Sequence, residues 1–242
     1  MQNNPIIKND PTGHKEIESG NCDAALKKST PPCPKDTKDR RDLTDWMARA
    51  LVDSAKNPSI KHIARLNKEK SLLSAVQANG EFTALVKNDA YFDVKWNVLD
   101  SVGHTIKLGN NWYEFSASGN IMYGFYGSAA NFSPTALYQG AGAAQKFDDF
   151  LFSWGLSKHP EYHTNLGPLE SPFYGDTEDD HYGVQVGIEL YEQYQNTGTL
   201  TASDLAHALD TNPYKTKMNP QLSPSKCKPA TSDYPTDAFY NR

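Results

Sequence analysis

Residues 112–130 read WYEFSASGNIMYGFYGSAA, and the chain is predicted to change its local structure within this stretch. The first four residues have the aromatic-rich pattern of a short β-strand. Small residues follow, with glycines at positions 119, 124 and 127, where a backbone can approach its neighbour closely. This second part predicts either a tightly packed helix with small residues at its interface, or a segment in which glycines take positive φ values and Asn120 and Tyr123 present polar groups among apolar neighbours.

Three segments upstream of this stretch also have strand character: residues 82–86, 91–98 and 105–108. Each is short and rich in β-branched or aromatic residues, and Asn-Asp, Gly-His and Gly-Asn-Asn sequences separate them from one another and from residue 112. Together with residues 112–115 they predict a small antiparallel sheet at about residues 82–116, with a turn at Asn110-Asn111.

Apolar residues at helical spacing dominate the sequence before this sheet. Asp42 is predicted to cap a first helix, and Asn57-Pro58 separates it from a second helix that follows Ser59. Residues 71–78 are predicted either to continue this second helix or to form another short helix, with Asn79-Gly80 as the end.

Helical signals return after the sheet. Helices are predicted from Ser133-Pro134 to Gln145 and over residues 148–154, 179–195 and 201–209, with Ser203 as the cap of the last helix and a long loop at 158–172. The predicted fold class is therefore α+β: a mainly helical single domain with a small antiparallel sheet.

The two ends of the chain differ in composition from its middle. Residues 1–41 contain no Phe, Trp or Tyr and five Pro, and residues 212–242 contain another five Pro. Such segments bury too little apolar surface to offset the entropy lost on ordering. We expect residues 1–41 to be a flexible leader or linker, residues 42–211 to be the folded domain, and residues 212–242 to be an extended Pro-rich tail.

The net charge of −5 conceals a strongly acidic middle. Residues 1–41 hold eight of the 24 Lys and Arg and six of the 29 Asp and Glu, and residues 212–242 hold five and two, which leaves eleven basic against twenty-one acidic residues in 42–211. Duplex nucleic acid is bound through clustered cations, so we expect no stable duplex binding. A metal-dependent nuclease stays open, because such enzymes need carboxylates at their centre.

Cysteines and the start of the chain restrict the chemistry and the route of export. Cys22, Cys33 and Cys227 all lie in the flanks, so we expect no cysteine nucleophile in the domain. In an oxidising compartment one disulfide, either Cys22–Cys33 or a bridge to Cys227, would leave one thiol over. Residues 1–5 lack the basic and apolar regions of a signal peptide, and no apolar stretch is long enough to span a membrane. We therefore expect any export to proceed without a cleaved signal peptide.

Residues 174–181 read YGDTEDDH and gather four carboxylates at the start of a predicted helix. Acidic residues in the first turn of a helix are favoured by the helix dipole, which is a purely structural explanation. Alternatively, crowded carboxylates hold a divalent cation, Mg²⁺ or Ca²⁺, or share a proton so that one of them acts as a general acid. The sequence leaves both explanations open.

Four segments in chain order resemble the bacterial polymorphic toxin type 44 domain family, over about residues 80–195. The first is Val86-Lys87-Asn88 followed by Phe92-Asp93-Val94-Lys95, and the second is Gly119-Asn120-Ile121-Met122-Tyr123-Gly124. The third is Leu137 to Gln145 with Gly140-Ala141-Gly142, and the fourth is Tyr174-Gly175-Asp176 with Asp180, Gly187 and Tyr191. Asp176 and Asp180 match the family's pattern, whereas Phe92, Thr177, Glu178 and His181 depart from it.

The resemblance implies an antibacterial toxin that is secreted or injected and that a cognate immunity protein neutralises. It also implies a carrier protein of a secretion machine, with the toxin domain at residues 42–211 as a nearly free-standing effector. Because this domain is acidic, we expect the immunity protein to have a basic contact face.

The matched polar residues are of the types needed for hydrolysis by general acid–base catalysis. The predicted catalytic residues are Asp176, Asp180, Tyr123, Asp93 and Lys95, and the predicted substrate-binding residues are Asn120, Gln145 and Trp112. The predicted substrate is the glycan of peptidoglycan in the periplasm of a target bacterium, with a carboxyl near Tyr123 protonating the leaving oxygen. The alternatives are a nuclease in which Asp176 and Asp180 hold Mg²⁺, and a membrane-disrupting toxin without enzymatic activity.

Overall fold

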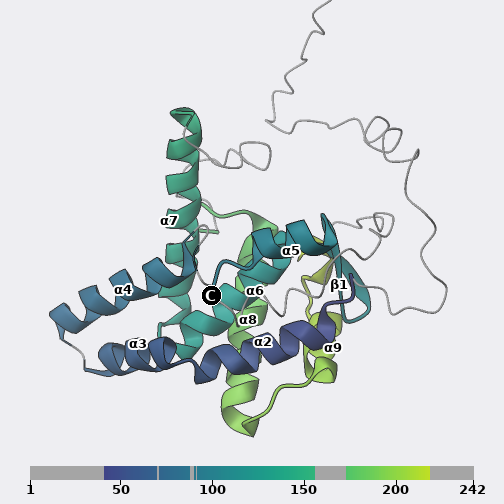
Figure 1. Cartoon of the computed structure of the whole chain (residues 1–242), viewed down its shortest axis with the longest axis horizontal. Coiled ribbons are helices and arrows are strands. Elements are labelled where there is room, and N and C mark those ends of the chain that lie inside the picture. Colours follow the sequence, from purple (N-terminus) through teal and green to yellow (C-terminus); the bar gives the residue numbers. More distant parts are fainter. Residues whose placement is uncertain (1–40, 70, 88–89, 91, 156–172, 219–242) are drawn as a thin grey trace, which may run out of the picture.

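Two helices, α6 (Ser116–Ala129) and α8 (Glu178–Thr197), pack against each other at the centre of the fold, as Figure 1 shows. A Cβ atom at Gly124 would lie 2.1 Å from the backbone oxygen of Val184, and one at Gly187 would lie 2.0 Å from that of Ile121. Only glycine permits this approach of the two backbones. The glycine-rich stretch therefore forms a tightly packed helix, which is one of the two structures predicted for it.

The structure is a computed structural model that describes residues 41–69, 71–87, 90, 92–155 and 173–218. The predicted leader lies outside the described residues except for Arg41, and the predicted tail is described only over residues 212–218. The predicted loop at 158–172 and the three cysteines also lie outside them. None of the described helices is long and apolar enough to cross a membrane.

The chain before the sheet forms α2 (Thr44–Lys56), α3 (Pro58–Lys68) and α4 (Leu72–Val86). The break at Asn57-Pro58 is confirmed: the Asn57 side chain accepts a hydrogen bond from the N–H of Ser59, and Pro58 is the first residue of α3. Asp42 lies one residue before the N-cap of α2 rather than at it. Its carboxylate accepts hydrogen bonds from the N–H and the hydroxyl of Thr44, at 3.2 and 2.6 Å.

Two of the four predicted strands are wrong. Residues 82–86 belong to α4, which continues through Asn79-Gly80, and residues 91–98 contain the start of α5 (Lys95–Val102). In both helices buried residues lie four apart, Ala78 with Phe82 in α4 and Val98 with Val102 in α5. This spacing is typical of a helix. The β-branched and aromatic composition favoured a strand, but strand propensity depends strongly on context and did not determine the structure here.

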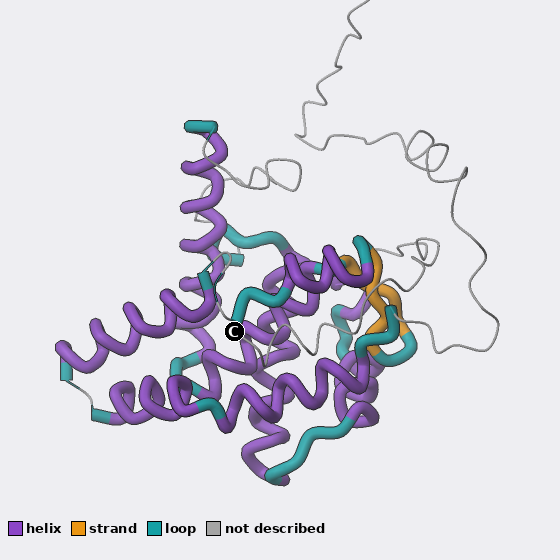
Figure 2. The backbone as a smooth tube through the Cα atoms, in the orientation of Figure 1, coloured by secondary structure: helices purple, strands orange, loops and turns teal. Residues whose placement is uncertain are grey.

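The other two predicted strands pair as expected. β1 (Thr105–Leu108) and β2 (Asn111–Glu114) form an antiparallel two-stranded sheet. Leu108 pairs with Asn111, so the turn is Gly109-Asn110, one residue earlier than predicted. Gly109 has a φ of +61°, which suits a tight hairpin turn. Figure 2 shows this sheet at one edge of a fold that is otherwise helical.

Two helices frame the centre of the fold from outside. α7 (Pro134–Ser153) is one long helix that joins two predicted ones, and Ser133 caps it by accepting a hydrogen bond from the N–H of Ala136 at 3.2 Å. The far end of α7 projects from the molecule (Figure 1). α9 (Ala202–Thr211) is capped by Thr201 in a reciprocal box with Asp204, so the prediction of Ser203 as its cap is wrong.

The described part of the predicted tail contacts the folded domain. Residues 215–218 form a short helix, α10 (Lys215–Met218). The ring of Tyr214 stacks on that of Tyr182 with 4.1 Å between centroids, and Lys217 forms an ion pair with Glu178. These contacts fasten the chain to the beginning of α8.

The fold class is α+β as predicted, mainly helical with one small antiparallel sheet. A single core extends from the N-terminal helices through α6 to α8 and α9. Its largest fully buried side chains include Tyr113, Tyr126 and Phe125. The core places the start of α8 beside α5, α6 and the end of β2.

Candidate active site

The acidic segment at residues 174–181 forms a sharp turn followed by the first turn of α8. The N–H of Asp176 donates to the carbonyl of Phe173 at 3.0 Å, while Tyr174 and Gly175 have φ values of +59° and +89°. A left-handed tyrosine is uncommon, so the surrounding structure must hold this turn in place. The turn directs Asp176 inward, where 8% of its surface is exposed.

α7 supports the turn from one side. A Cβ atom at Gly142 would lie 1.9 Å from the carbonyl oxygen of Tyr174, so glycine is needed at this contact. The ring of Tyr138, also on α7, stacks on the ring of Tyr174 with 6.2 Å between centroids. The Gly140-Ala141-Gly142 segment thus has a structural role in positioning the acidic turn.

Thr177 is the N-cap of α8. Its hydroxyl accepts a hydrogen bond from the N–H of Asp180 at 3.3 Å, and its own N–H donates to Asp176 at 3.0 Å. Glu178, Asp179 and Asp180 lie in the first turn of α8, where the helix dipole stabilises acidic side chains. Their position agrees with the purely structural explanation of this acidic segment. Asp176 precedes the cap and is buried, so the helix dipole alone does not explain its presence.

Asp180 is joined to the central helix α6. The side-chain amide of Asn120 donates a hydrogen bond to Oδ1 of Asp180. Close helix packing makes this contact possible, since a Cβ atom at Gly183 would lie 2.8 Å from the Cβ atom of Asn120. Two predicted site residues sixty positions apart in the sequence therefore lie together.

Burial raises the pKa of both aspartates. The pKa of Asp176 rises to about 7, chiefly through burial; the Thr177 N–H and Lys95 oppose this rise, and Asp179 adds to it by repulsion. The pKa of Asp180 lies well above its usual value because of burial and then repulsion from Asp179 and Asp176. Because the two carboxyls disfavour each other's ionisation, the pair retains a proton near neutral pH.

Lys95 provides the positive charge of the site. Its ammonium favours the ionised forms of both Asp176 and Asp180 and thus opposes the rise of their pKa values. The side-chain stem packs on α6, where a Cβ atom at Gly119 would lie 3.3 Å from that of Lys95. The ammonium also lies 5.3 Å from the ring centroid of Trp96.

Tyr123 is a neutral neighbour of the pair. Burial and then the charge of Asp176 raise the pKa of its phenol above the usual value. The hydroxyl donates a hydrogen bond to the carbonyl of Leu137 at 3.2 Å, in space left by the missing side chain of Gly140. Tyr123 can therefore serve as a hydrogen-bonding group but not as a base.

Glu114 is a site residue that the sequence analysis missed. Burial raises the pKa of its carboxyl, and repulsion from Asp179 raises it further. Glu114 ends β2 between two buried aromatic residues, Tyr113 and Phe115. The sequence signal that could have identified Glu114 is an acidic residue between two aromatic residues of a predicted strand. The described carboxylates of the site are thus Glu114, Asp176, Asp179 and Asp180.

Three other predicted residues surround this group less directly. Asp93 is half-buried just before α5, two residues from Lys95. The ring of Trp112 is covered by the guanidinium of Arg41, 4.7 Å from its centroid. The amide of Gln145 donates to Asp149 at 3.4 Å within α7. Trp112 and Gln145 therefore have contacts away from the aspartate pair.

Asp176 and Asp180 are the residues with which the chain could hold a divalent cation. Within the described part of the chain, no group of three or more His, Cys, Asp and Glu side chains is arranged as a metal site. A cation at this pair would need further oxygen ligands from water or substrate.

His181 lies in an aromatic cluster behind the acidic turn. Its ring centroid is 4.4 Å from that of Tyr138 and 5.2 Å from that of Phe173. Burial lowers the pKa of the imidazole, and its buried Nδ1 has no hydrogen-bond partner among the described residues. Neutral His181 thus helps to pack the turn that carries Asp176.

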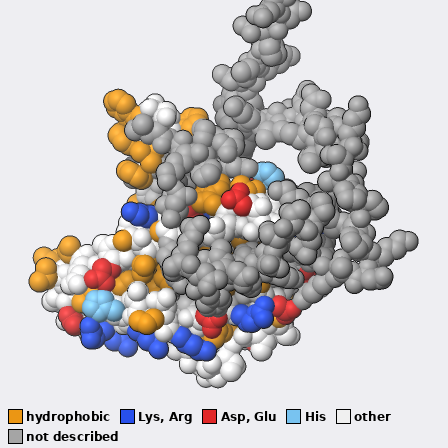
Figure 3. Space-filling view, viewed as in Figure 1, with side chains coloured by type: hydrophobic (Ala, Val, Ile, Leu, Met, Phe, Trp, Pro, Cys, Tyr) orange, Lys and Arg blue, Asp and Glu red, His pale blue; other side chains and the backbone are white. Residues whose placement is uncertain are grey.

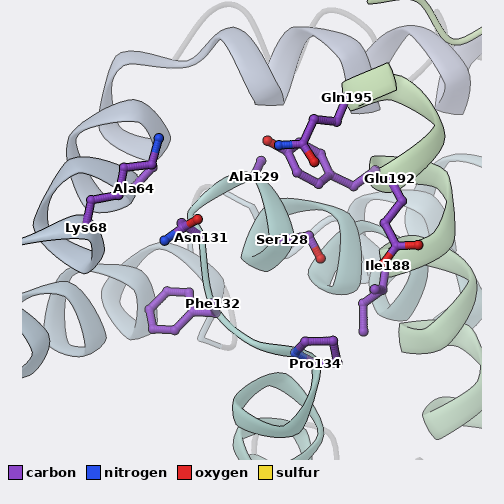
Figure 4. Close-up of a pocket in the computed structure, with 11 residues that line it drawn as sticks. Ala64, Lys68, Ser128, Ala129, Asn131, Phe132, Pro134, Ile188, Glu192 and Gln195 are labelled. Atoms are coloured by element: carbon purple, nitrogen blue, oxygen red, sulfur yellow. The ribbon is translucent and has the colours of Figure 1, made fainter. Parts of the chain in front are cut away.

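A hollow of about 190 Å³ lies elsewhere on the molecule, between α3, the α6–α7 connection and α8 (Figure 4). Lys68 lines it from α3, and Glu192 and Gln195 line it from α8. None of the predicted site residues lines this hollow. Since a helix rises 1.5 Å per residue, Glu192 lies about 18 Å along α8 from Asp180.

Residues 73–193, half of the chain, match the model of the family described as bacterial toxin 44. The match confirms the resemblance read from the four motifs. It includes Lys95, Glu114, Asn120 and the aspartate pair. No curated protein and no solved structure matches the chain.

Proposed function

The chain belongs to the bacterial toxin 44 family and is a bacterial toxin, and from this premise we propose that it is an antibacterial effector that hydrolyses the glycan strands of peptidoglycan. The observation that carries the proposal is the pair of buried Asp176 and half-buried Asp180, in which the pKa of Asp176 is raised to about 7. Such a group is partly protonated at neutral pH and can still release its proton readily.

Glycosidases of the common kind use two carboxyl groups, one to protonate the leaving oxygen and one to activate water or stabilise the sugar cation. Asn120 donates a hydrogen bond to Asp180, which favours the ionised form of this carboxyl, whereas burial raises its pKa. On the basis of this hydrogen bond we assign the proton of the pair to Asp176. Asp176 is then the general acid. Asp180 acts on the opposite side of the reaction as base, nucleophile or stabilising charge.

The neighbouring charges adjust this acid to neutral pH. Repulsion from Asp179 keeps the pKa of Asp176 high, and Lys95 limits the rise so that the proton can leave. Burial has the largest influence on the pKa of Asp176. In known glycosidases, burial likewise raises the pKa of the carboxyl that acts as the general acid. Asn120 is a positioning residue, because it acts on Asp180 through a hydrogen bond.

A nuclease is the second candidate. Four carboxylates, from β2, the turn before α8 and the first turn of α8, gather beside one lysine, and this arrangement would suit a divalent cation with Lys95 stabilising the charge on phosphate. The membrane-disrupting alternative has less support. The glycines of α6 lie within the fold, against Lys95 of α5, Val184 of α8 and Leu137 of α7.

The proposal places the toxin in the periplasm of the target cell, delivered with a carrier protein and neutralised by an immunity protein with a basic face. Expression in a bacterial host with and without a periplasmic export signal tests it. The wild-type chain should lyse the host only when exported, and the exported Asp176→Asn variant should be harmless. Killing by the unexported chain with loss of DNA or RNA would favour the nuclease instead.

A further inference from the structure

The end of α3 and the beginning of α4 project together from one side of the fold (Figure 1). We refer to this region as the α3–α4 tip. It comprises Arg65 and Lys68 at the end of α3, the acidic Glu69 that follows them, and the apolar residues Leu72, Leu73 and Val76 of α4. Lys61 lies one turn before Arg65 on the same face of α3 and is counted with its cations. Neither group takes part in the aspartate site.

The apolar residues of the tip are among the most exposed in the described chain. Leu72, Leu73 and Val76 expose 84, 78 and 62% of their surface. Three large aliphatic side chains at one projecting end are unfavourable in water unless something covers them. The buried residues of α4 are Ser74, Ala78 and Phe82, which lie on the opposite face of the helix.

The cations of the tip lie on one face of α3. Lys61, Arg65 and Lys68 are spaced by four and three residues, and α3 contains no acidic residue. Lys61 and Lys68 have no ion-pair partner among the described residues. Arg65 contacts Nδ1 of His62 at 2.8 Å, and Nε2 of His62 lies 3.4 Å from Glu81. In Figure 3, Lys and Arg side chains gather along the lower left edge of the molecule and hydrophobic side chains at its left end, with acidic side chains and a histidine between them.

We propose that the α3–α4 tip docks on the surface of an anionic phospholipid bilayer. The aliphatic side chains enter the boundary between headgroups and acyl chains, and the cations of α3 contact the lipid phosphates. A convex apolar end suits a deformable lipid surface, whereas a protein partner would have to offer a matching groove. Because the chain carries a net charge of −5, such a surface repels the molecule as a whole, and the cations of α3 provide a local attraction at this region.

Sedimentation of the full chain with lipid vesicles tests the proposal. The chain should bind vesicles of phosphatidylcholine mixed with phosphatidylglycerol and should not bind vesicles of phosphatidylcholine alone. Binding should weaken as the salt concentration rises, because salt screens the attraction of the cations.

Two double variants separate the apolar and the charged contributions. Leu72→Asn with Leu73→Asn should reduce vesicle affinity by about 10-fold or more, because the side chains no longer gain from leaving water. Lys61→Gln with Lys68→Gln should reduce it by about 30-fold, as expected for two cations near an anionic surface. All four positions are exposed, and unchanged circular dichroism would show that the fold is intact.

Arg49→Gln with Lys56→Gln is the matched control. It removes the same net charge from α2, where acidic residues alternate with the two cations, and it should change the affinity by less than about 3-fold. The proposal is overturned if the chain binds neither vesicle, or if both double variants at the tip bind as the wild type does. Equal losses in the tip and control charge variants would also overturn it, since binding would then follow net charge alone.

Discussion

The side-chain amide of Asn120 on α6 donates a hydrogen bond to the carboxylate of Asp180 on α8, across the closest packed interface of the fold. The glycines that allow these helices to approach therefore also position the site. Gly183 lies beside Asn120, and Gly124 and Gly187 hold the same interface one and two turns away. Stability and chemistry depend here on the same pair of helices.

Replacing either aspartate should abolish toxicity and leave the fold intact. Asp176→Asn and Asp180→Asn each remove a group that transfers or accepts a proton, so hydrolysis should fall at least about 100-fold. Toxicity in the host and thermal unfolding are the measurements, with Asp100→Asn as a control because Asp100 is exposed on α5. A folded Asp176→Asn variant that stays fully toxic would assign Asp176 to helix structure alone.

The ionised side chain of Asp176 should lower the free energy of unfolding of the protein at neutral pH and above. Its folded-state pKa of about 7 exceeds the usual 3.8, so the folded state binds more protons than the unfolded state between about pH 4 and pH 7. The free energy of unfolding should therefore fall as the pH rises through this range and should level off above it. Asp176→Asn should be more stable than the wild type at pH 8, by at most about 4 kcal/mol, and this difference should shrink towards pH 4. Urea unfolding at several pH values would measure it, and equal stabilities at pH 8 would contradict the raised pKa.

Asp179 and Lys95 should shift the pH profile of hydrolysis in opposite directions. Activity is lost on the alkaline side as the general acid loses its proton. Asp179→Asn removes a repulsion that raises the pKa of Asp176, so the alkaline limb should move to lower pH. Lys95→Gln removes an attraction that lowers it, so the limb should move to higher pH. Shifts in the same direction would show that these charges do not act on the acid.

The fold could be predicted from the sequence where a single local signal was strong. Asn57-Pro58 was identified as a break between two helices and Ser133-Pro134 as a helix start, because a cap and a proline act within a few residues. The strands predicted at 82–86 and 91–98 failed because short apolar runs fit both periods, and contacts with the distant core selected helices there.

The site was predictable only in part. Asp176, Asp180 and Asn120 were found because they lie in sequence motifs, although their meeting depends on packing between α6 and α8. Glu114 was missed because its role arises from burial and from Asp179, which is 65 positions away. Trp112 was assigned by residue type and Gln145 because it ends the third motif. In the structure the guanidinium of Arg41 covers Trp112, and Gln145 donates to Asp149.

The central interface should tolerate no added methyl group. Gly124→Ala would place a Cβ atom 2.1 Å from the carbonyl oxygen of Val184, a backbone group that cannot move alone, and should destabilise the fold by about 3 kcal/mol or more. Gly80→Ala is the matched control, because no atom lies within 4 Å of its added Cβ in the middle of α4. It should stabilise the protein by about 1 kcal/mol through helix propensity. Thermal unfolding of both variants would show whether Gly124→Ala lowers the stability of the protein and Gly80→Ala raises it.

Digestion of purified peptidoglycan tests the central claim most directly. The wild-type chain and Asp176→Asn would each be incubated with intact sacculi, and the released fragments analysed by mass spectrometry and by assay of new reducing ends. We predict that the wild type releases fragments cut in the glycan strands, with new reducing ends and intact stem peptides, and that Asp176→Asn releases none. Undigested sacculi with a folded wild-type chain that is toxic to bacteria, or cleavage in the peptides alone, would contradict the assignment of the aspartate pair to glycan hydrolysis.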